Sequence, residues 1–179
     1  GNRYFGDLMI KLNEQPQCVV MLVDGAAMGG GLGLVCVSDV AICDQDTRFS
    51  MTETSLGIPP AQIAPFVAER LGITQSRRLM LTGARFKGAD AMHYGVGPIL
   101  ADDADDMEAK CAQVLKEISL CAPGANAVTK AIVFEATRKP RDQALDFAAQ
   151  GFAKCMLSDE GREGIAAFVE KRKPYWAQD

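Results

Sequence analysis

The sequence predicts an α/β fold in which a core of short strands and helices precedes a wholly helical region. An apolar run at residues 19–23, rich in β-branched side chains, has the composition of a strand buried on both faces. Three glycines at 29–31 then open a helical segment that continues to Val37. From Asp103 onward every segment has helical character. Strands early and helices late are typical of an α/β core with a helical extension.

Local signals mark each element of the core. Apolar residues at helical spacing predict a helix over residues 2–13, which Pro16 ends. Prolines at 59, 60 and 65 predict a rigid loop followed by the start of a helix. The other expected elements are short strands at 40–43 and 48–51, helices at 62–71 and 75–81, a short helix from residue 87, and a strand at 96–100.

The second part of the chain contains four expected helices. Pro123 and Pro140 separate some of them. These helices are expected at 106–119, 124–137, 141–157 and 160–171. We therefore expect one division of the chain, between a core at residues 1–100 and a helical region at residues 101–179.

Composition limits the class of protein. Hydrophobic residues make up 48% of the 179 residues and charged residues 23%, as in an ordinary globular protein. A net charge of −4 argues against nucleic acid or a membrane as the main partner. Six scattered cysteines without CxxC spacing, and a single histidine, give no expectation of a metal site. We expect small buried cysteines in a reducing, cytoplasmic compartment.

The glycine run at 29–31 is the first candidate for function. Without side chains, these residues let a ligand approach the backbone closely. Their N–H groups at the start of a helix suit an anion, or an oxyanion formed during a reaction. Tight packing of the helix against the strand remains an equal alternative, because glycine permits that as well.

Glu53 is the most interesting ionisable residue. It follows a strand-like segment and precedes an apolar loop with few charges nearby. A carboxyl group in such a setting suits proton transfer near neutral pH. The alternative is an ordinary charge at a helix start or on a surface loop.

Four segments together resemble the crotonase superfamily of enoyl-CoA hydratases and isomerases. They read GAAMGGGLGLVCVSD, RFSMTETSLGIPP, LTGARFKGADA and DEGREGIAAFVEKRKP, and they occur in the family's order. The resemblance implies a spiral core of repeated ββα units and a C-terminal helical trimerisation region. It also implies assembly into trimers or hexamers. The family's subunit has a further N-terminal portion that we expect to be absent from this chain.

The resemblance assigns roles to particular residues. Family enzymes stabilise an enolate of an acyl-CoA thioester with two backbone N–H groups, of which one falls on Gly30. The other belongs to the N-terminal portion. Family hydratases use two glutamates; the second falls on Glu53, and the position of the first is Gly33. Isomerases of the superfamily work with a single glutamate at the position of Glu53.

The resemblance also suggests a substrate. GGGLGL and PPAQIAPFV are similar to bacterial hydratases of 3-branched glutaconyl-CoA thioesters, such as 3-methylglutaconyl-CoA or isohexenylglutaconyl-CoA, in leucine or acyclic-terpene breakdown. Those enzymes can also carry glycine at the first position. The distal carboxylate of such a substrate could help to position water. CoA arrives as part of the substrate, and no metal or redox cofactor is implied.

Further family positions are substrate contacts. Phe168 and Lys171, three residues apart and therefore expected on one helical face, match positions that contact CoA, often from a neighbouring subunit. Core packing is the alternative for Phe168. The residues expected around the acyl group are Met28, Gly29, Thr52, Leu56 and Ala61.

The leading hypothesis is an enoyl-CoA hydratase with Glu53 as general acid and base and the Gly30 N–H as an oxyanion donor. A double-bond isomerase that uses Glu53 alone is the first alternative. A non-catalytic acyl-CoA-binding homologue is the second, because Gly33 has no side chain.

Overall fold

The computed structural model describes residues 1–177, and it divides into two compact units. The first unit comprises residues 1–13 and 19–113. The second comprises residues 14–18 and the chain from 114 onward. The division into a spiral core at 1–100 and a trimerisation region at 101–179 stays a prediction.

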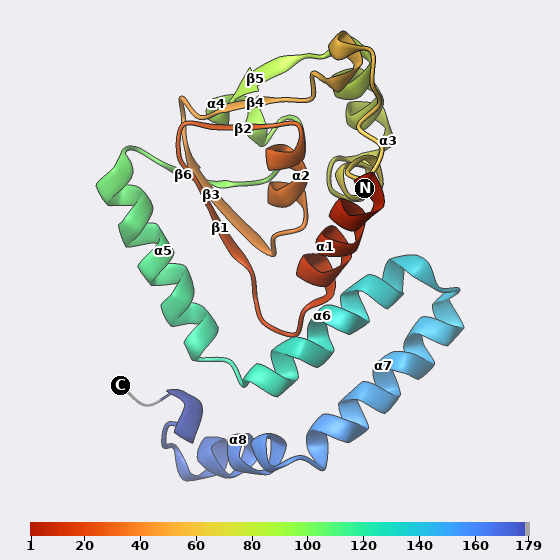
Figure 1. Ribbon diagram of the computed structural model, residues 1–179. Coiled ribbons are helices and arrows are strands. Elements are labelled where there is room, and N and C mark those ends of the chain that lie inside the picture. Colours follow the sequence, from red (N-terminus) through yellow and green to blue (C-terminus); the bar gives the residue numbers. More distant parts are fainter. Residues whose placement is uncertain (178–179) are drawn as a thin grey trace. The chain divides into compact units, whose positions relative to one another are not determined.

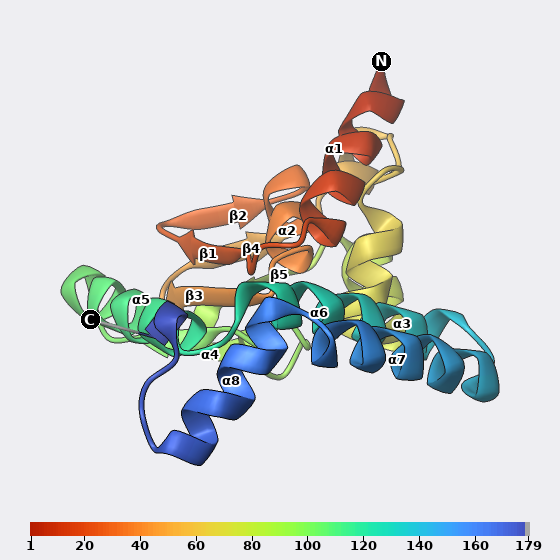
Figure 2. The same cartoon turned by 90° about the horizontal axis from the view of Figure 1, so that it is seen from below.

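The first unit contains two three-stranded sheets, and the strands β1 to β4 alternate between them (Figures 1 and 2). One sheet has the order β1-β3-β6 and is wholly parallel. In the other, β4 pairs parallel with β2 and antiparallel with β5. The strands are β1 (Val20–Val23), β2 (Ala26–Met28), β3 (Val40–Asp44), β4 (Arg48–Ser50), β5 (Arg85–Lys87) and β6 (Ile99–Ala101).

Tight corners send the chain from one sheet to the other. Between β1 and β2, Gly25 has a φ of 75°, which favours glycine. Between β3 and β4, the Asp44 side chain accepts hydrogen bonds from the N–H groups of Asp46 and Thr47, at 2.7 and 2.6 Å. Because the Gly25 carbonyl accepts the N–H of Arg48 at 3.0 Å, the second corner is stacked on the first.

Four sequence predictions about the strands are wrong in detail. The short strands β2 and β5 are missing from the prediction, since three residues carry little periodicity. The last strand begins at Ile99 rather than at residue 96, after Gly97 with a φ of 66° and a proline. The first strand is not buried on both faces, because Leu22 is 46% exposed.

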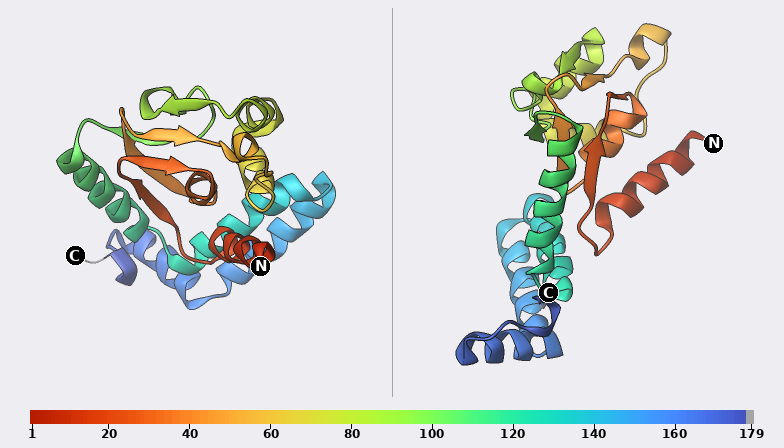
Figure 3. Two further views of the ribbon diagram at one scale, coloured as in Figure 1. Left: turned by 45° about the horizontal axis from the view of Figure 1, so that its top comes forward. Right: turned by 90° about the vertical axis from the view of Figure 1, so that its left-hand side faces the viewer.

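Helices cover the sheets of the first unit and complete its core (Figure 3). The helix α3 contains a kink at Gly72, where φ is 74° and ψ is 162°, and so agrees with the two helices predicted there. Met9, Leu32, Phe49, Val67 and Leu79 are fully buried in the core. The helices are α1 (Asn2–Glu14), α2 (Gly30–Cys36), α3 (Ala64–Thr82), α4 (Gly88–Ala91) and α5 (Ala104–Ser119), of which α5 continues into the second unit, together with the 3-10 helix η1 (Glu53–Leu56).

The second unit is helical. Its elements are α6 (Pro123–Arg138), α7 (Arg141–Met156), α8 (Asp159–Glu170) and the 3-10 helix η2 (Tyr175–Ala177). Helices α6 and α7 lie side by side and antiparallel (Figures 1 and 3). Neither has a fully buried residue. Lys130 ties α6 to the segment 14–18 by donating to the carbonyls of Gln15 and Gln17 at 3.0 and 2.6 Å.

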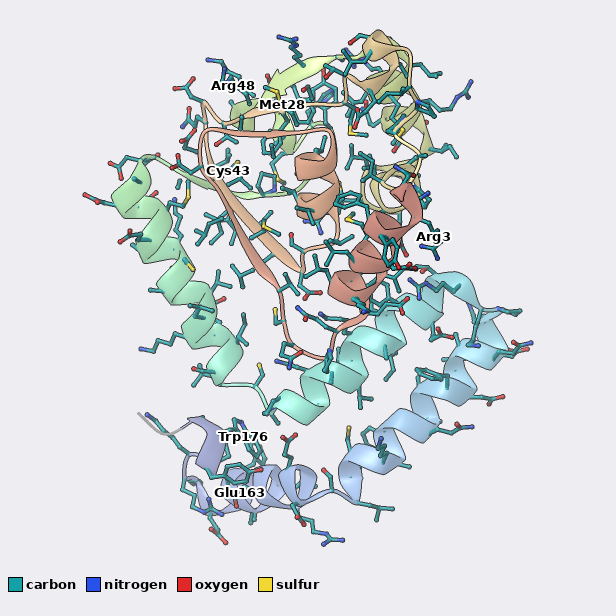
Figure 4. The ribbon with its side chains drawn as sticks, viewed as in Figure 1. Arg3, Met28, Cys43, Arg48, Glu163 and Trp176 are labelled. Carbon is teal, nitrogen blue, oxygen red and sulfur yellow. The ribbon has the colours of Figure 1, made fainter. Side chains whose placement is uncertain are left out.

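The C-terminal segment folds back within the second unit. The Arg172 guanidinium donates to both carboxylate oxygens of Glu163, at 2.6 and 2.9 Å. The Trp176 indole N–H donates to the carbonyl of Leu120 at 3.3 Å, and Figure 4 shows Glu163 and Trp176 near each other. Among residues 1–177, no helix is long and apolar enough to cross a membrane.

Candidate active site

The glycine turn has a backbone conformation that glycine alone adopts readily. Gly29 has a φ of 52° and a ψ of −117°. Its N–H donates to the carbonyl of Ser50 at 2.9 Å, and its carbonyl accepts the first helical hydrogen bond, from Gly33, at 3.0 Å. The N–H of Gly30 therefore has no acceptor within its own helix. Within the described part of the chain no backbone acceptor is found for it either.

Glu53 lies directly against this turn. A Cβ added at Gly29 would lie 2.7 Å from Oε1 of Glu53, so the carboxylate occupies the space that a side chain would need. The other oxygen, Oε2, is buried and has no hydrogen-bond partner among residues 1–177. A buried carboxylate oxygen without a partner is costly, and such groups are found at ligand and catalytic sites.

The loop that carries Glu53 is anchored. The Thr54 hydroxyl donates to the carbonyl of Met80 at 2.8 Å, and the Ser55 hydroxyl donates to the carbonyl of Thr52 at 2.6 Å. Gly57 ends η1 with a φ of 78°. These contacts fix the short helix on α3, so the fold holds the carboxylate beside the glycine turn.

Gly33 has no room for a side chain. A Cβ added there would lie 2.6 Å from Cγ2 of Ile63 and 3.4 Å from Cε of Met9. Ile63 is 4% exposed and Met9 is fully buried. The position that the resemblance gives to a first glutamate is therefore filled by apolar side chains from α1 and from the loop before α3.

Helix α1 forms one wall of the site. The ring of Phe5 lies 3.4 Å from a Cβ placed on Gly30, and Met9, one turn further, packs at Gly33. Phe5 and Met9 are four residues apart on α1, and the glycines that they contact are three residues apart on α2. Each pair therefore lies on one face of its helix. Sequence reasoning missed Phe5, Met9 and Ile63, because none of them carries a chemical group that a motif would reveal.

The remaining predicted acyl contacts differ in their exposure. Met28 is an exposed residue at the end of β2, in the sheet that β2 forms with β4 and β5 (Figure 4). Thr52 is half-buried, whereas Leu56 and Ala61 are exposed. The structure brings Glu53, Gly29 and Gly30 together. The acyl-pocket roles of the other residues stay predictions.

Phe168 and Lys171 lie in the second unit and are exposed. Phe168 is 86% exposed, so the structure does not support its alternative role in core packing. The expected common helical face is wrong for Lys171. Helix α8 ends at Glu170, and Lys171 is its C-cap with a φ of 55°. A left-handed cap residue leaves the helical spacing, so the two side chains do not follow the three-residue rule.

The cysteines are only partly as expected. Cys36 and Cys43 are buried, and burial raises the pKa of Cys36 to about 12 and that of Cys43 to about 11. These two thiols therefore stay protonated at neutral pH and behave as small apolar groups. Cys121 is exposed, and the other three are half-buried. In residues 1–177 no three histidine, cysteine, aspartate or glutamate side chains gather in a metal-binding arrangement.

Comparison with known families decides the relationship. The family model described as enoyl-CoA hydratase/isomerase matches residues 2–179. The chain belongs to the enoyl-CoA hydratase/isomerase family. The matched residues include both the glycine turn and the loop that carries Glu53.

Solved structures confirm the crotonase-like α/β fold of this family member. The chain is similar to Pseudomonas aeruginosa AtuE, with 50% identity and a TM-score of 0.95, over 99% of this chain and 69% of that one. It is also similar to an enoyl-CoA hydratase/isomerase from Marinobacter aquaeolei, with 44% identity and a TM-score of 0.94, over 99% of this chain and 67% of that one.

Curated relatives of the family are more distant. The enoyl-CoA hydratase ACTT6 of Alternaria alternata is 30% identical over 90% of this chain and 54% of its own length. The short-chain-enoyl-CoA hydratase of Clostridium acetobutylicum is 28% identical over 97% of this chain and 65% of its own length. The chain thus spans between about half and two thirds of the curated relatives that it matches.

Proposed function

We propose that the protein is an enoyl-CoA hydratase that adds water to a 2-enoyl-CoA thioester. The observation that carries the proposal is the Glu53 carboxylate. It is packed against Gly29 beside the Gly30 N–H, and its Oε2 is buried without a partner in the described residues. An acid–base group next to an available N–H donor is what the formation and protonation of an enolate require.

In the proposed reaction, the thioester oxygen accepts the Gly30 N–H and a second donor from outside residues 1–179. Water forms a bond to the β-carbon, the carbon–carbon π bond breaks, and negative charge moves to the thioester oxygen. The Glu53 carboxylate takes up a proton from the attacking water, and the carboxyl group so formed then gives a proton to the α-carbon, which restores the carboxylate. A preset N–H donor at such an oxygen contributes about 3 kcal/mol to the transition state.

Only one carboxylate serves this chemistry in the described residues around the turn. Since Ile63 and Met9 fill the space at Gly33, a second carboxylate has no place there. Glu53 therefore has to act as both base and acid, with help from the substrate in positioning the water. We propose a 3-branched glutaconyl thioester such as 3-methylglutaconyl-CoA or isohexenylglutaconyl-CoA, whose distal carboxylate orients the water.

Exposed apolar side chains support the assembly that we propose, and the cysteines support the proposed location. Phe152, Leu157 and Phe168 are large exposed apolar side chains of the second unit, and surfaces of this kind are usually covered by a partner. A homotrimer or hexamer would cover them, and light scattering of the protein in solution tests this. The six free cysteines favour a cytoplasmic location. The proposed substrate would place the enzyme in leucine or acyclic-terpene breakdown.

Mass spectrometry of the products formed in D₂O tests the proposed function. A hydratase gives a 3-hydroxyacyl-CoA with deuterium at the α-carbon. An isomerase, which the single carboxylate also permits, gives an enoyl-CoA of shifted double bond without added water. Binding of acyl-CoA without turnover of any of several enoyl-CoAs would contradict both and support a non-catalytic binding protein.

A further inference from the structure

Two cysteines from distant parts of the chain line one cavity of the second unit. Cys18 ends the segment 14–18, and Cys121 lies in the short joint between α5 and α6. The cavity has a volume of about 420 Å³, and Trp176 lines it as well. Two thiols that border one space have a route to each other that does not pass through packed side chains.

The segment that carries Cys18 is held on α6. Lys130 donates to the carbonyls of Gln15 and Gln17, at 3.0 and 2.6 Å. Side chains of a helix lean toward its N-terminus, so Lys130 reaches back along α6 to these carbonyls. The segment is therefore fixed over the N-terminal half of α6.

Cys121 lies at the same end of this helix. Helix α6 begins at Pro123, two residues after Cys121. Pro123 and Asn126, which belong to its first turn, line the cavity together with Cys18. Since an α-helix rises about 1.5 Å per residue, one turn of α6 is all that separates the surroundings of the two cysteines.

Neither cysteine belongs to a helix or a strand. Cys18 lies between α1 and β1, and Cys121 lies between α5 and α6. A disulfide needs Cα atoms about 4–7 Å apart, and an irregular backbone adjusts to this distance more easily than a helix does. The present contact of the Cys121 thiol is a weak hydrogen bond to the carbonyl of Glu117, at 3.6 Å, which is readily given up.

Exposure distinguishes this pair from the other thiols. Cys121 is the exposed cysteine of the chain, so an oxidant in solution reaches it directly, and Cys18 is half-buried beside it. Cys36 and Cys43 are buried, and burial raises their pKa values to about 12 and about 11. A thiol reacts as its thiolate, so these two stay inert under the same conditions.

We propose that Cys18 and Cys121 form a reversible disulfide when the protein meets a peroxide. The sulfur of Cys121 attacks one peroxide oxygen, the O–O bond breaks, and the other oxygen leaves as water with the thiol proton. The sulfur of Cys18 then attacks the sulfenic acid so formed, an S–S bond replaces the S–O bond, and a second water leaves. One peroxide is reduced and two thiols are oxidised, and cellular thiols reverse the step by exchange.

The disulfide joins the segment before β1 to the joint between α5 and α6. A link between residues 18 and 121 closes a long loop, so it restricts the unfolded chain and stabilises the folded one. Trp176 is placed to report the change, because its indole N–H donates to the carbonyl of Leu120, next to Cys121. In a reducing compartment such a bond is transient and acts as a redox sensor. This inference does not depend on the proposed function.

Mass spectrometry of the peroxide-treated protein tests the proposal. Remaining thiols are alkylated, and the chain is cut after lysine, arginine, aspartate and glutamate. Cys18 then lies in the peptide 15–24 and Cys121 in the peptide 118–130, each with a single cysteine. We expect these two peptides to be linked in the wild type and to separate after treatment with dithiothreitol.

Three variants show whether the link is specific. Cys18→Ser should leave Cys121 as a sulfenic or higher acid, and Cys121→Ser should leave Cys18 reduced. Cys155→Ser is the matched control, because Cys155 is also half-buried but lines the neighbouring cavity. It should keep the link. The melting temperature should rise by at least about 5 °C on oxidation of the wild type and of Cys155→Ser, and in neither of the other variants.

Several outcomes would overturn the proposal. One is that both thiols of the peroxide-treated wild type remain open to alkylation, or that both become sulfonic acids without a link. Another is that the linked peptides come from two chains, which a non-reducing gel shows as a dimer band. Linkage of either cysteine to a different cysteine would also reject the pair.

Discussion

Replacement of Gly33 by alanine examines why this site has a single carboxylate. The added Cβ would lie 2.6 Å from Cγ2 and 2.9 Å from Cβ of Ile63, closer than side-chain carbons normally approach. Because Ile63 and Met9 are themselves buried in the core, neither can move aside into solvent. The added methyl group therefore has to push apart α2 and the loop that precedes α3.

The magnitude follows from two opposing effects. Alanine in place of glycine within a helix is favourable by about 1 kcal/mol. Overpacking a filled core typically costs about 1–3 kcal/mol. We expect a net destabilisation of Gly33→Ala of about 0–2 kcal/mol. Gly31→Ala is the matched control on the same helix, since its Cβ would lie 3.7 Å from Cβ of Ala27, an ordinary contact. It should gain up to about 1 kcal/mol.

Urea denaturation followed by circular dichroism, at one protein concentration, measures both changes. A double-mutant cycle with Ile63→Ala then tests the contact itself, because removal of the Ile63 methyl groups should recover about 1 kcal/mol of the cost in the double variant. If Gly33→Ala is as stable as Gly31→Ala, and shows no coupling to Ile63, the explanation of the missing carboxylate is refuted.

Two further predictions concern the turn and the C-terminal segment. Gly29→Ala should lower turnover at least about tenfold, because its Cβ would displace the Glu53 carboxylate 2.7 Å away. Gly25→Ala is the control, because Gly25 also has a positive φ of 75° but no atom lies within 4 Å of the added Cβ. It should lose stability but not activity. Equal losses of activity in the two variants would reject a specific effect on Glu53. Hydrogen bonds from Arg172 hold the pKa of Glu163 in the folded protein below its usual 4.5. The ionised carboxylate therefore stabilises the fold at any pH above the pKa of the unfolded state. This contribution is lost as the pH falls through the lower pKa of the folded state. The emission of the single tryptophan, Trp176, should therefore change below about pH 4.5 in the wild type and much less in Glu163→Gln, and identical acid transitions would contradict this role.

Local sequence signals predicted much of the fold and the centre of the site. The strand of apolar residues at 19–23, the glycine-opened helix and the proline-separated helices are all determined by neighbouring residues. The kink of α3 at Gly72 falls between the two helices predicted at 62–71 and 75–81. The glycine run and Glu53 were singled out from the residues themselves, whereas Gly30 was assigned by the resemblance, and the fold brings Glu53 against Gly29.

Contacts between distant residues could not be predicted in this way. Ile63 fills the space at Gly33 although thirty positions separate them, and no spacing rule connects the two. The cavity that Cys18 and Cys121 share has the same character. A strand of three residues such as β5 forms because neighbouring strands of its sheet pair with it. The left-handed conformation of Lys171 follows from the end of α8 at Glu170, which the sequence pattern did not reveal.

The rate of hydration by Glu53→Gln tests the central claim most directly. Glutamine keeps the size and shape of the side chain but can neither take up nor release the proton. On the enoyl-CoA that the wild type hydrates best, kcat should fall by at least about 100-fold, while the affinity for a saturated acyl-CoA is retained. Turnover equal to that of the wild type would contradict the assignment of Glu53 as the acid and base of this site.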